Sequence, residues 1–449
     1  MSNGTLPNYL KLARPNPPEN RAPWYKNTAP TYAGIFLWVV FYMKIAEGTL
    51  PKAGLGLSLL ALVIAALICH FLFYLVPGLL GMQTGYPLYV VGSSTYGTAG
   101  GFLMPGLLMG LLQFGWLGVN IAVSASFVLQ AAGVDASAGT PSFIIAAVIW
   151  GLAAAFIGVK GTQYVAKVAT FLPIVPLIMI LIVFFCNVGT VKDFQVAADA
   201  DWSMGFMTMI AIVVGFFATA GAAGVDFGMG SRNSKDVRLG GLVGIALAII
   251  VAGGLPLIAI AGAKGANPAL ESFSFDAVIR EQGGFLAKSM FILFAIASFA
   301  PACFSSFIAA NSIGTMFPKA NKMGMVLIGA VISIVLAVTG VALNLVGVFS
   351  IIGASFGPIC GSMVADYLLS GQKWAGPRKG INWAGYIAWA VGFVVAILPM
   401  VGGEKYKFIT PAPVIAFVIG FILYAVLAKA GLEPAVVELS SNEAAKHEG

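Results

Sequence analysis

The stretch LLQFGWLGVN, residues 111–120, lies in the middle of an apolar run that carries no charged residue from position 85 to position 134. Such a run is long enough to cross the hydrocarbon core of a bilayer, about 30 Å thick, as an α-helix. Gln113, Trp116 and Asn120 follow one another at the spacing i, i+3, i+7, which places them on one helix face. A polar stripe at mid-membrane must face protein or a water-filled cavity, because a lipid-facing amide would lack a hydrogen-bond partner.

Two interpretations of this stripe are open. Gln and Asn often bridge packed helices, and Gly110, Gly115 and Gly118 would let neighbouring backbones come close. Alternatively, the stripe is one wall of a ligand site. Trp116 favours the second interpretation, because a membrane Trp usually lies at the interface, whereas this one is more than a dozen residues from either end of the uncharged run. A buried indole beside the Gln113 carboxamide suits a flat ligand with hydrogen-bonding edges.

The whole chain has the composition of a polytopic membrane protein. Of its 449 residues 59% are hydrophobic and only 9% are charged, against roughly a quarter charged in soluble domains. The apolar segments are too long for the ~10-residue alternation of a membrane barrel. We therefore predict an all-α protein with twelve transmembrane helices, at about 31–50, 55–80, 103–130, 141–159, 165–187, 206–227, 239–262, 285–312, 323–343, 346–370, 382–401 and 410–429.

The basic residues predict the orientation. With both termini cytoplasmic, the inside segments hold sixteen Lys and Arg and the outside segments seven, which is the bias that cytoplasmic loops carry. We expect a cytoplasmic N-terminal segment over residues 1–29, which is Pro-rich and lacks the apolar core of a signal peptide. A single transmembrane domain over 30–430 and a polar cytoplasmic tail over 431–449 follow. The expected location is the cytoplasmic (inner) membrane of a bacterium.

Several other function classes fit poorly. The four cysteines lie in apolar spans without a CxxC spacing, and there are only two histidines, so we expect neither a metal site nor a cofactor. No DDxxD motif exists for a metal-dependent membrane enzyme, and His70 is the only histidine inside a span; we predict that the protein is not an enzyme. Because the net charge of +7 is sorted by loop, it does not indicate nucleic acid as a partner; the expected partners are membrane lipid and a small solute.

Two further spans carry unusual glycine patterns. The sixth reads IAIVVGFFATAGAAGVDFGMGSRNSKD, with Thr219 among five glycines, and interrupted helices are how many transporters expose backbone groups to a substrate. Close helix packing explains the glycines equally well. Asp226 near the end of this span is expected to pair with Arg232 or Lys235. The tenth span, around Pro358, is expected to bend, as a gate or as a static kink.

The first span contains Lys44, which is costly inside a membrane, about 2.5–3.5 kcal/mol on insertion scales. Glu47 lies one helical turn away and near the outer surface. Lys44 therefore either extends outward and pairs with Glu47, or acts as a built-in cation or proton-coupled switch.

Four segments together resemble one family. QFGWLGV on the third span, FFATAG…VDFGMGSRNSK on the sixth, ASFGPICGSMVADYL on the tenth and TGYPLYVVGSSTYG before the third are similar, in order and spacing, to the purine–cytosine permeases of the nucleobase:cation symporter family. The likeness covers residues from about 30 to 400. It implies a LeuT-type fold, in which spans one to five (about 30–190) and six to ten (about 200–370) form inverted repeats, with two extra helices at about 382–430.

The resemblance also implies a substrate site. In this family the substrate ring lies between an aromatic residue on the third span and one on the sixth, and a carboxamide and a small hydroxyl residue contribute polar contacts next to exposed backbone. With Asn120 from the stripe, the predicted substrate-binding residues are Gln113, Trp116, Asn120, Phe217, Thr219, Ala220 and Gly221.

The cation site of sodium-coupled relatives is altered at the matching positions. Its ligands are backbone carbonyls of the first span and hydroxyl or amide side chains of the eighth, which correspond here to Phe36, Val39 and Val40 and to Phe299, Ala302 and Cys303, with Phe304 where an Asn is usual. Sodium prefers oxygen ligands, which Phe, Ala and Cys side chains do not offer. A one-residue shift of the alignment would bring a hydroxyl from Ser298, Ser305 or Ser306.

We therefore predict a secondary active permease that imports a nucleobase or related flat heterocycle by alternating access. The missing sodium ligands favour proton coupling or sodium-independent exchange, with Lys44 or another titratable group in place of the cation. Sodium symport remains the alternative for the coupling ion. A hydantoin- or allantoin-like compound, an amino acid or an amine remains the alternative for the substrate.

Overall fold

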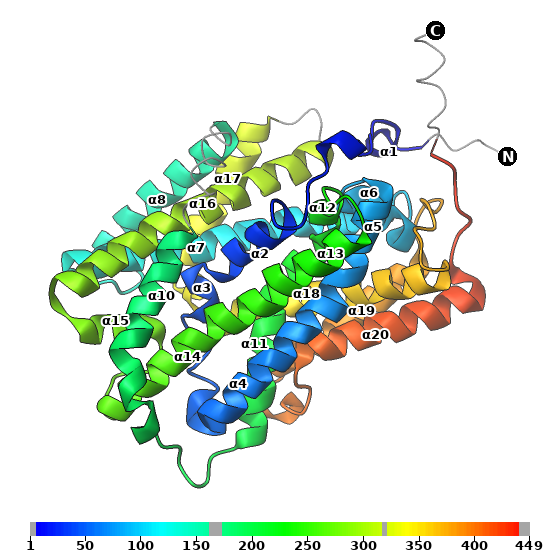
Figure 1. Cartoon of the computed structure of the whole chain (residues 1–449). Coiled ribbons are helices and arrows are strands. Elements are labelled where there is room, and N and C mark those ends of the chain that lie inside the picture. Colours follow the sequence, from blue (N-terminus) through cyan, green and yellow to red (C-terminus); the bar gives the residue numbers. More distant parts are fainter. Residues whose placement is uncertain (1–5, 161–172, 317–320, 440–449) are drawn as a thin grey trace.

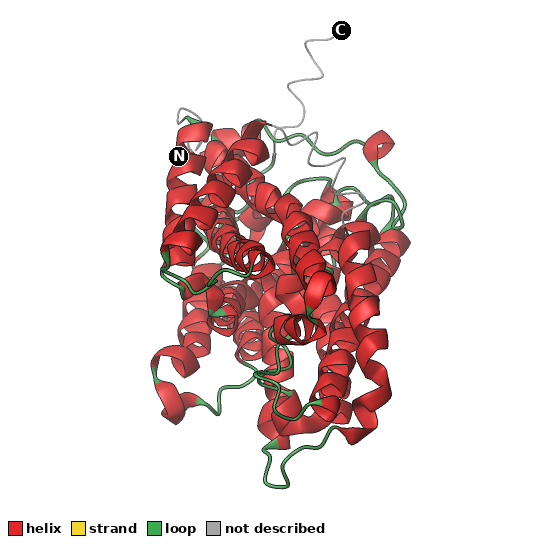
Figure 2. Ribbon diagram, turned by 90° about the vertical axis from the view of Figure 1, so that its left-hand side faces the viewer, coloured by secondary structure: helices red, strands yellow, loops and turns green. Residues whose placement is uncertain are grey.

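The computed structural model describes residues 6–160, 173–316 and 321–439, and within them the chain folds into a bundle of helices with no extended sheet (Figure 2). Within these ranges, ten helices are long and apolar enough to cross a membrane. They coincide with ten of the twelve predicted spans, and the all-helical membrane fold is confirmed. The other two predicted spans contain shorter helices, so the count of twelve remains a prediction.

The first half of the bundle runs from the first to the fifth predicted span. Residues 161–172, where the fifth span was predicted to begin, lie outside the described residues. The helices here are α2 (Thr28–Phe36), α3 (Val39–Tyr42), α4 (Leu50–Ile68), α5 (Leu75–Thr84), α6 (Leu88–Tyr96), α7 (Leu108–Ala132), α8 (Pro141–Lys160) and α10 (Ile174–Asn187), after a short α1 (Asn8–Lys11). A π-helical turn at Cys69–Tyr74 joins α4 to α5, and another at Phe102–Leu107 precedes α7.

The second half and two added helices complete the bundle (Figure 1). The helices are α11 (Trp202–Ala222), α12 (Gly224–Gly228), α13 (Ser234–Gly241), α14 (Ala248–Ala266), α15 (Phe275–Gln282), α16 (Gly284–Met316), α17 (Lys322–Val338), α18 (Leu345–Leu369), α19 (Trp383–Val401) and α20 (Ala412–Leu427). A π-helical turn at Leu242–Leu247 continues α13 into α14. The division into inverted repeats stays a prediction.

The first and sixth predicted spans are interrupted. Between α2 and α3 the backbone of Trp38 is extended, with φ −67° and ψ 126°, so the helical hydrogen bonding is broken there. The Leu37 carbonyl next to it accepts the Tyr42 hydroxyl at 3.4 Å. On the sixth span, α11 ends at Ala222 and α12 continues after Ala223. The break at Trp38 opens backbone inside the bundle, which is typical of transporter cores, whereas the break at Ala223 follows the membrane-spanning helix α11.

The tenth span is a continuous helix rather than a broken one. α18 runs from Leu345 to Leu369 with Pro358 inside it. Glycines of α18 and α20 let the two helices pack closely. A Cβ on Gly361 of α18 would lie 2.1 Å from the Phe417 carbonyl oxygen, and a Cβ on Gly420 of α20 would lie 2.5 Å from the Pro358 carbonyl oxygen. The glycine pattern here therefore serves close helix packing.

Both described ends of the chain lie at the same end of the bundle, which we call the terminal face. The Tyr9 hydroxyl donates to the Thr98 carbonyl at 2.7 Å, just after α6. The Thr98 amide in turn donates to the Arg378 carbonyl at 2.7 Å, and Arg378 forms an antiparallel bridge with Val436. The opposite end of the bundle is called the distal face.

A buried network of charged residues connects chain segments at the terminal face. The Arg378 guanidinium pairs with Asp366 at the end of α18, with Nη1 to Oδ1 at 2.9 Å, and with Glu433 in the C-terminal segment. Asp366 also accepts the Ser94 hydroxyl from α6 at 2.6 Å. The network joins three segments that are more than 50 residues apart in sequence, so it stabilises their arrangement at this face.

Candidate functional site

A cavity of about 1240 Å³ lies at the interruptions of the first and sixth spans. Its deep end is lined by side chains from α3, α7, α11 and α16 and from the break before α3: Trp38, Val39, Met109, Gln113, Trp116, Phe216, Thr219, Ala220, Phe294, Ala297, Ser298 and Pro301. It reaches the terminal face, where Lys26, Tyr89 and Met229 line it. Its volume is ample for a small heterocycle, since ligand pockets range over about 300–1,000 Å³.

Gln113 presents its carboxamide to this cavity. The side chain is 8% exposed, and the hydrogen-bond partner of its Nε2 among the described residues is the Met109 sulfur at 3.7 Å. A thioether is a weak acceptor. The carboxamide is therefore almost free of protein partners and can bond to the edge of a ligand.

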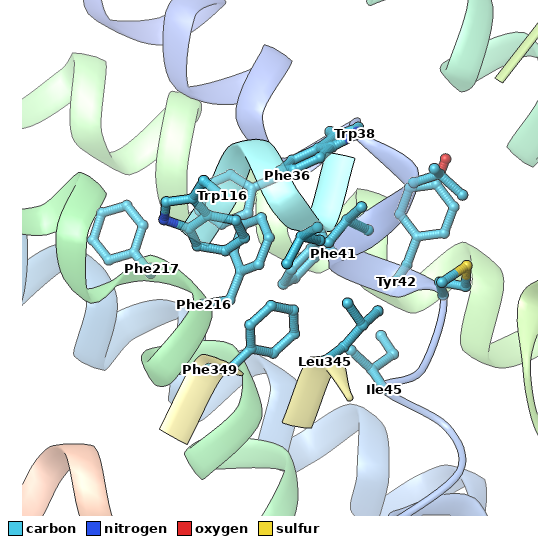
Figure 3. Packing of buried hydrophobic residues seen from close by; sticks show 14 of the residues in the cluster. Phe36, Trp38, Phe41, Tyr42, Ile45, Trp116, Phe216, Phe217, Leu345 and Phe349 are labelled. Atoms are coloured by element: carbon cyan, nitrogen blue, oxygen red, sulfur yellow. The ribbon is translucent and has the colours of Figure 1, made fainter. Parts of the chain in front are cut away.

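Trp116 forms the wall of the cavity and the edge of an aromatic cluster (Figure 3). Its ring centroid lies 5.2 Å from that of Phe216, 5.7 Å from that of Trp38 and 5.8 Å from that of Phe349. Phe41 packs on Phe216 at 5.0 Å. These rings fill the space between the deep end of the cavity and the distal face, so the cavity is closed on that side.

The sixth-span ring at the cavity is Phe216, not the predicted Phe217. Phe217 is fully buried and stacks on Phe36, with centroids 5.7 Å apart and planes at 25°, and it also contacts Tyr32 at 5.8 Å. Consecutive residues of a helix are about 100° apart around the axis, so a one-residue error in matching the family pattern selects the wrong face. Phe217 supports the wall from behind, and Phe216 is the ring that a ligand would meet.

Of the other residues predicted on the sixth span, two line the cavity and one lies at a helix contact. Thr219 and Ala220 line the cavity. The Thr219 hydroxyl accepts the Trp116 indole N–H at 3.3 Å, and the Ala220 carbonyl accepts the Tyr32 hydroxyl at 2.8 Å. Gly221 lies on the packing side, because a Cβ there would be 2.9 Å from the Phe73 Cβ. Thr219 thus fixes the indole, and Gly221 allows close helix contact.

Asn120 is separated from the cavity by its own bonds. Its Nδ2 donates to the Ser298 carbonyl at 2.7 Å, and its Oδ1 accepts the Trp150 indole at 3.1 Å. The side chain is 1% exposed and does not line the cavity. Asn120 therefore bridges α7 to α16 and α8, which is the packing role that the stripe left open.

The predicted cation positions on the first span surround its interruption. Val39 lines the cavity, and its carbonyl accepts the Met43 amide at 2.9 Å. Phe36 and Val40 are fully buried and do not line it. The exposed backbone lies between Phe36 and Val39.

The predicted eighth-span positions turn away from that interruption. Phe299 meets the Trp150 ring at 5.3 Å, and Cys303 packs its carbonyl against α8 at Gly158, where a Cβ would be 2.5 Å from the oxygen. Ala302 is fully buried and its carbonyl accepts the Ser306 hydroxyl. These residues face α8 because they lie on the opposite side of the helix from the cavity-lining positions.

The hydroxyl beside the interruption is Ser298, one residue from the predicted Phe299. Its Oγ accepts the Trp38 indole N–H at 3.2 Å and donates to the Phe294 carbonyl at 2.8 Å. From the sequence, Ser298 was expected here only if the alignment shifted by one residue. What the sequence lacked was the rotation of α16 about its axis, which is known only from the residues that contact α8.

Lys44 lies outside the cavity. Its Nζ pairs with the Glu47 carboxylate at 2.5 Å, and the two side chains are 29% and 37% exposed. This is the outward-directed pairing that the sequence left as one alternative. Lys44 is not among the described residues that line the cavity, so this geometry does not support a role in place of a cation.

Among the described residues, Asp226 is the carboxylate that lines the cavity, whereas the sequence predicted for it a pairing with Arg232 or Lys235. It lies in α12, after the membrane-spanning part of α11, and its Oδ1 accepts the Leu88 amide at the start of α6 at 2.9 Å. Burial raises the pKa of Asp226 to about 6, while the hydrogen bond from Leu88 acts in the lowering direction. The expected pairing with Arg232 is not formed, because Arg232 binds Asp236 at 2.8 Å.

Comparison with known proteins gives relatives of one kind. No family model matches the chain. The cytosine permease of Escherichia coli strain K12 is 27% identical over 377 residues, which cover 80% of this chain and 85% of that protein.

Solved structures share the fold over nearly the whole chain. Mhp1, a nucleobase-cation-symport-1 family transporter in a closed conformation with bromovinylhydantoin bound, aligns with a TM-score of 0.65 at 18% identity and covers 96% of this chain and 99% of that one. Its inward-facing conformation gives the same TM-score and identity over 95% and 97%. A Na⁺-coupled sialic acid symporter follows at a TM-score of 0.56, 13% identity and 94% and 92% coverage.

The fold and the cavity define a polytopic membrane transporter with a core of interrupted helices. Its relatives are permeases and transporters, which confirms the prediction that it is not an enzyme. The chain is similar in sequence to a cytosine permease and shares the fold of a nucleobase-cation-symport-1 family transporter, which agrees with the resemblance that its four segments indicated.

Proposed function

We propose that this transporter imports a nucleobase or a related flat heterocycle across the cytoplasmic membrane. The observation that carries the proposal is the pairing of two cavity residues: the Trp116 ring offers a flat apolar face, and the Gln113 carboxamide beside it lacks a strong protein partner. An aromatic face with a donor and acceptor at its edge suits a planar ring that carries both N–H and C=O groups. The relationship to the cytosine permease supports the same substrate class.

A hydantoin-like solute is the second candidate. The fold neighbour Mhp1 holds a bromovinylhydantoin, and a hydantoin ring is also planar with alternating donors and acceptors. The cavity of about 1240 Å³ has room for a ring with a substituent. Both candidates use the same Trp116 and Gln113 contacts, so a ligand panel is required to separate them.

The geometry supports alternating access with the cavity open toward the terminal face. Its lining reaches Lys26 and Met229 there, whereas Phe41, Phe216 and Phe349 pack between the cavity and the distal face. The excess of Lys and Arg in the segments of the terminal side supports a cytoplasmic position for both termini and an inner-membrane location. The described state then faces inward.

For the driving force we propose proton coupling or sodium-independent exchange. Phe299, Ala302 and Cys303 provide no oxygen to the interrupted first span. Ser298 is the hydroxyl that a sodium ion could use there, and its oxygen already accepts from Trp38 and donates to Phe294. Lys44 no longer carries this proposal, because it is paired with Glu47.

The experiment is uptake of labelled cytosine, other nucleobases, hydantoins and aliphatic amino acids by the purified protein in proteoliposomes. Sodium and pH gradients are imposed separately. We expect saturable uptake of a planar heterocycle without a sodium gradient. Uptake of an aliphatic solute alone would contradict the substrate proposal, and strict sodium dependence would contradict the coupling proposal.

A further inference from the structure

A second, smaller cavity lies on the outside of the bundle, away from the transport site. It has a volume of about 280 Å³ and lies between the α4–α5 and α13–α14 segments, which run side by side in Figure 1. Phe71 and Leu242 at its edge are 52% and 43% exposed, so in a membrane they face lipid. The lining residues are His70, Phe71, Leu75, Arg238, Leu239 and Leu242.

His70 is the first polar group of this cavity. Its side chain is 3% exposed, and its Nδ1 is buried without a hydrogen-bond partner among the described residues. The ring is held between Phe71, edge-on at 4.6 Å, and Tyr74, stacked at 6.0 Å. Buried polar groups are nearly always bonded, and an ionisable residue inside the membrane marks a functional site by default. Because Nδ1 is enclosed against Gly241, the Nε2 side of the fixed ring is the one that another molecule can reach.

Arg238 is the second polar group. Its guanidinium forms no hydrogen bond or ion pair with a described residue, in contrast to Arg232 just before α13, which binds Asp236 at 2.8 Å. Arg238 follows Val237, whose carbonyl accepts the Tyr74 hydroxyl at 3.2 Å, so it lies where α13 enters the bundle. Because Arg238 is exposed and uncompensated, its guanidinium is free to pair with a lipid phosphate.

Local backbone geometry supports a built site. The π-helical turns Cys69–Tyr74 and Leu242–Leu247 face one another across the cavity and contact each other. Such turns are rare and occur frequently at functional sites. Gly241 lets the two segments approach, because a Cβ there would lie 2.3 Å from Tyr74 and 2.6 Å from the His70 Nδ1.

We propose that this cavity binds an anionic phospholipid. The lipid phosphate pairs with the Arg238 guanidinium, which suits bidentate phosphate recognition. A headgroup hydroxyl or glycerol ester oxygen bonds to His70 Nε2, and one acyl chain lies along Phe71, Leu75 and Leu242. A free phosphate would use Arg238 alone and would leave this apolar lining uncovered.

The test uses the full-length protein in nanodiscs that contain phosphatidylglycerol and phosphatidylcholine in equal amounts. Native mass spectrometry counts the lipids that stay bound to the released protein. We expect the wild type to retain phosphatidylglycerol in preference, Arg238→Gln to lower its retention about fivefold, and Lys235→Gln, which removes a nearby cation outside the cavity, to leave it unchanged. Addition of inorganic phosphate should not displace the lipid.

A second variant distinguishes lipid binding in the cavity from attraction of lipid to general surface charge. Leu242→Trp fills the lipid-facing groove without changing the charge, and it should lower phosphatidylglycerol retention like Arg238→Gln. Normal retention in Leu242→Trp, equal losses in Arg238→Gln and Lys235→Gln, equal retention of the two lipids by the wild type, or displacement by phosphate would each overturn the proposal. Because the readout is lipid and not uptake, its outcome is independent of the proposed substrate.

Discussion

Replacement of Gln113 by Ala tests the ligand role of the polar stripe in a quantitative way. The only protein partner of its Nε2 among the described residues is the Met109 sulfur at 3.7 Å, a weak acceptor. Truncation therefore removes almost no hydrogen bonding that stabilises the fold. In the liganded state it removes up to two neutral hydrogen bonds to the ring edge, each worth about 0.5–1.5 kcal/mol.

These values give an expected loss of about 1–3 kcal/mol of binding free energy, which is about a 5- to 150-fold rise in Kd at 1.4 kcal/mol per factor of ten. The assay is equilibrium binding of the best ligand from the uptake panel to purified protein. The unfolding temperature of the same samples, measured without ligand, should be close to that of the wild type.

Gln130→Ala is the matched control on the same helix. Gln130 bonds to Ser126 at 3.0 Å and accepts from Arg280 at 2.8 Å, and it does not line the cavity. This variant should lose stability and keep its affinity, which is the reverse of Gln113→Ala. Wild-type affinity in Gln113→Ala, or a loss of stability as large as that of Gln130→Ala, would refute the reasoning.

Three further predictions concern stability, each followed by thermal unfolding of purified protein. Arg378→Met leaves the Asp366 carboxylate, 2.9 Å away in the wild type, buried and unpaired, and should lower the free energy of unfolding by about 3–5 kcal/mol. The double variant with Asp366→Asn should recover part of this loss. Additive losses in the double variant would argue against the ion pair. Gly81→Ala places a Cβ 1.9 Å from the Val225 carbonyl oxygen and should destabilise strongly, whereas Gly115→Ala meets nothing within 4 Å and should be tolerated. Burial raises the Asp226 pKa to about 6, above about 3.9 in the unfolded chain, so between these pH values the folded protein binds a proton that the unfolded chain releases. The free energy of unfolding should therefore fall as pH rises from about 4 to about 6. An equally steep fall in Asp226→Asn would assign the pH dependence to other groups.

Patterns along single helices predicted much of the fold and part of the site. The spacing of Gln113 and Trp116 placed both on one face, and both line the cavity. The same spacing included Asn120, but its carboxamide is bonded to Ser298 and Trp150 and does not line the cavity. A helix face is thus predictable from one sequence, whereas the partners that neighbouring helices bring to each residue of that face are not.

Which side of each helix faces its neighbours could not be predicted from the sequence. Phe216 and Phe217 are equally apolar, and only the packing of Phe217 against Phe36 shows which one faces inward. Ser298 and Phe299 differ in the same way, through contacts with α8. The Arg378 network was also hidden, because its partner Ser94 is 284 residues away. These features depend on tertiary contacts, which a local pattern does not encode.

Binding of a planar heterocycle to Trp116 variants tests the central claim most directly. Trp116→Ala removes the flat face, and it should cost about 1–3 kcal/mol of affinity, as base stacking on an aromatic ring does. Trp116→Phe keeps a ring and should retain part of that affinity. If the heterocycle binds Trp116→Ala as tightly as the wild type, while Phe216 and Thr219 remain in place, the proposed site is not where the substrate binds.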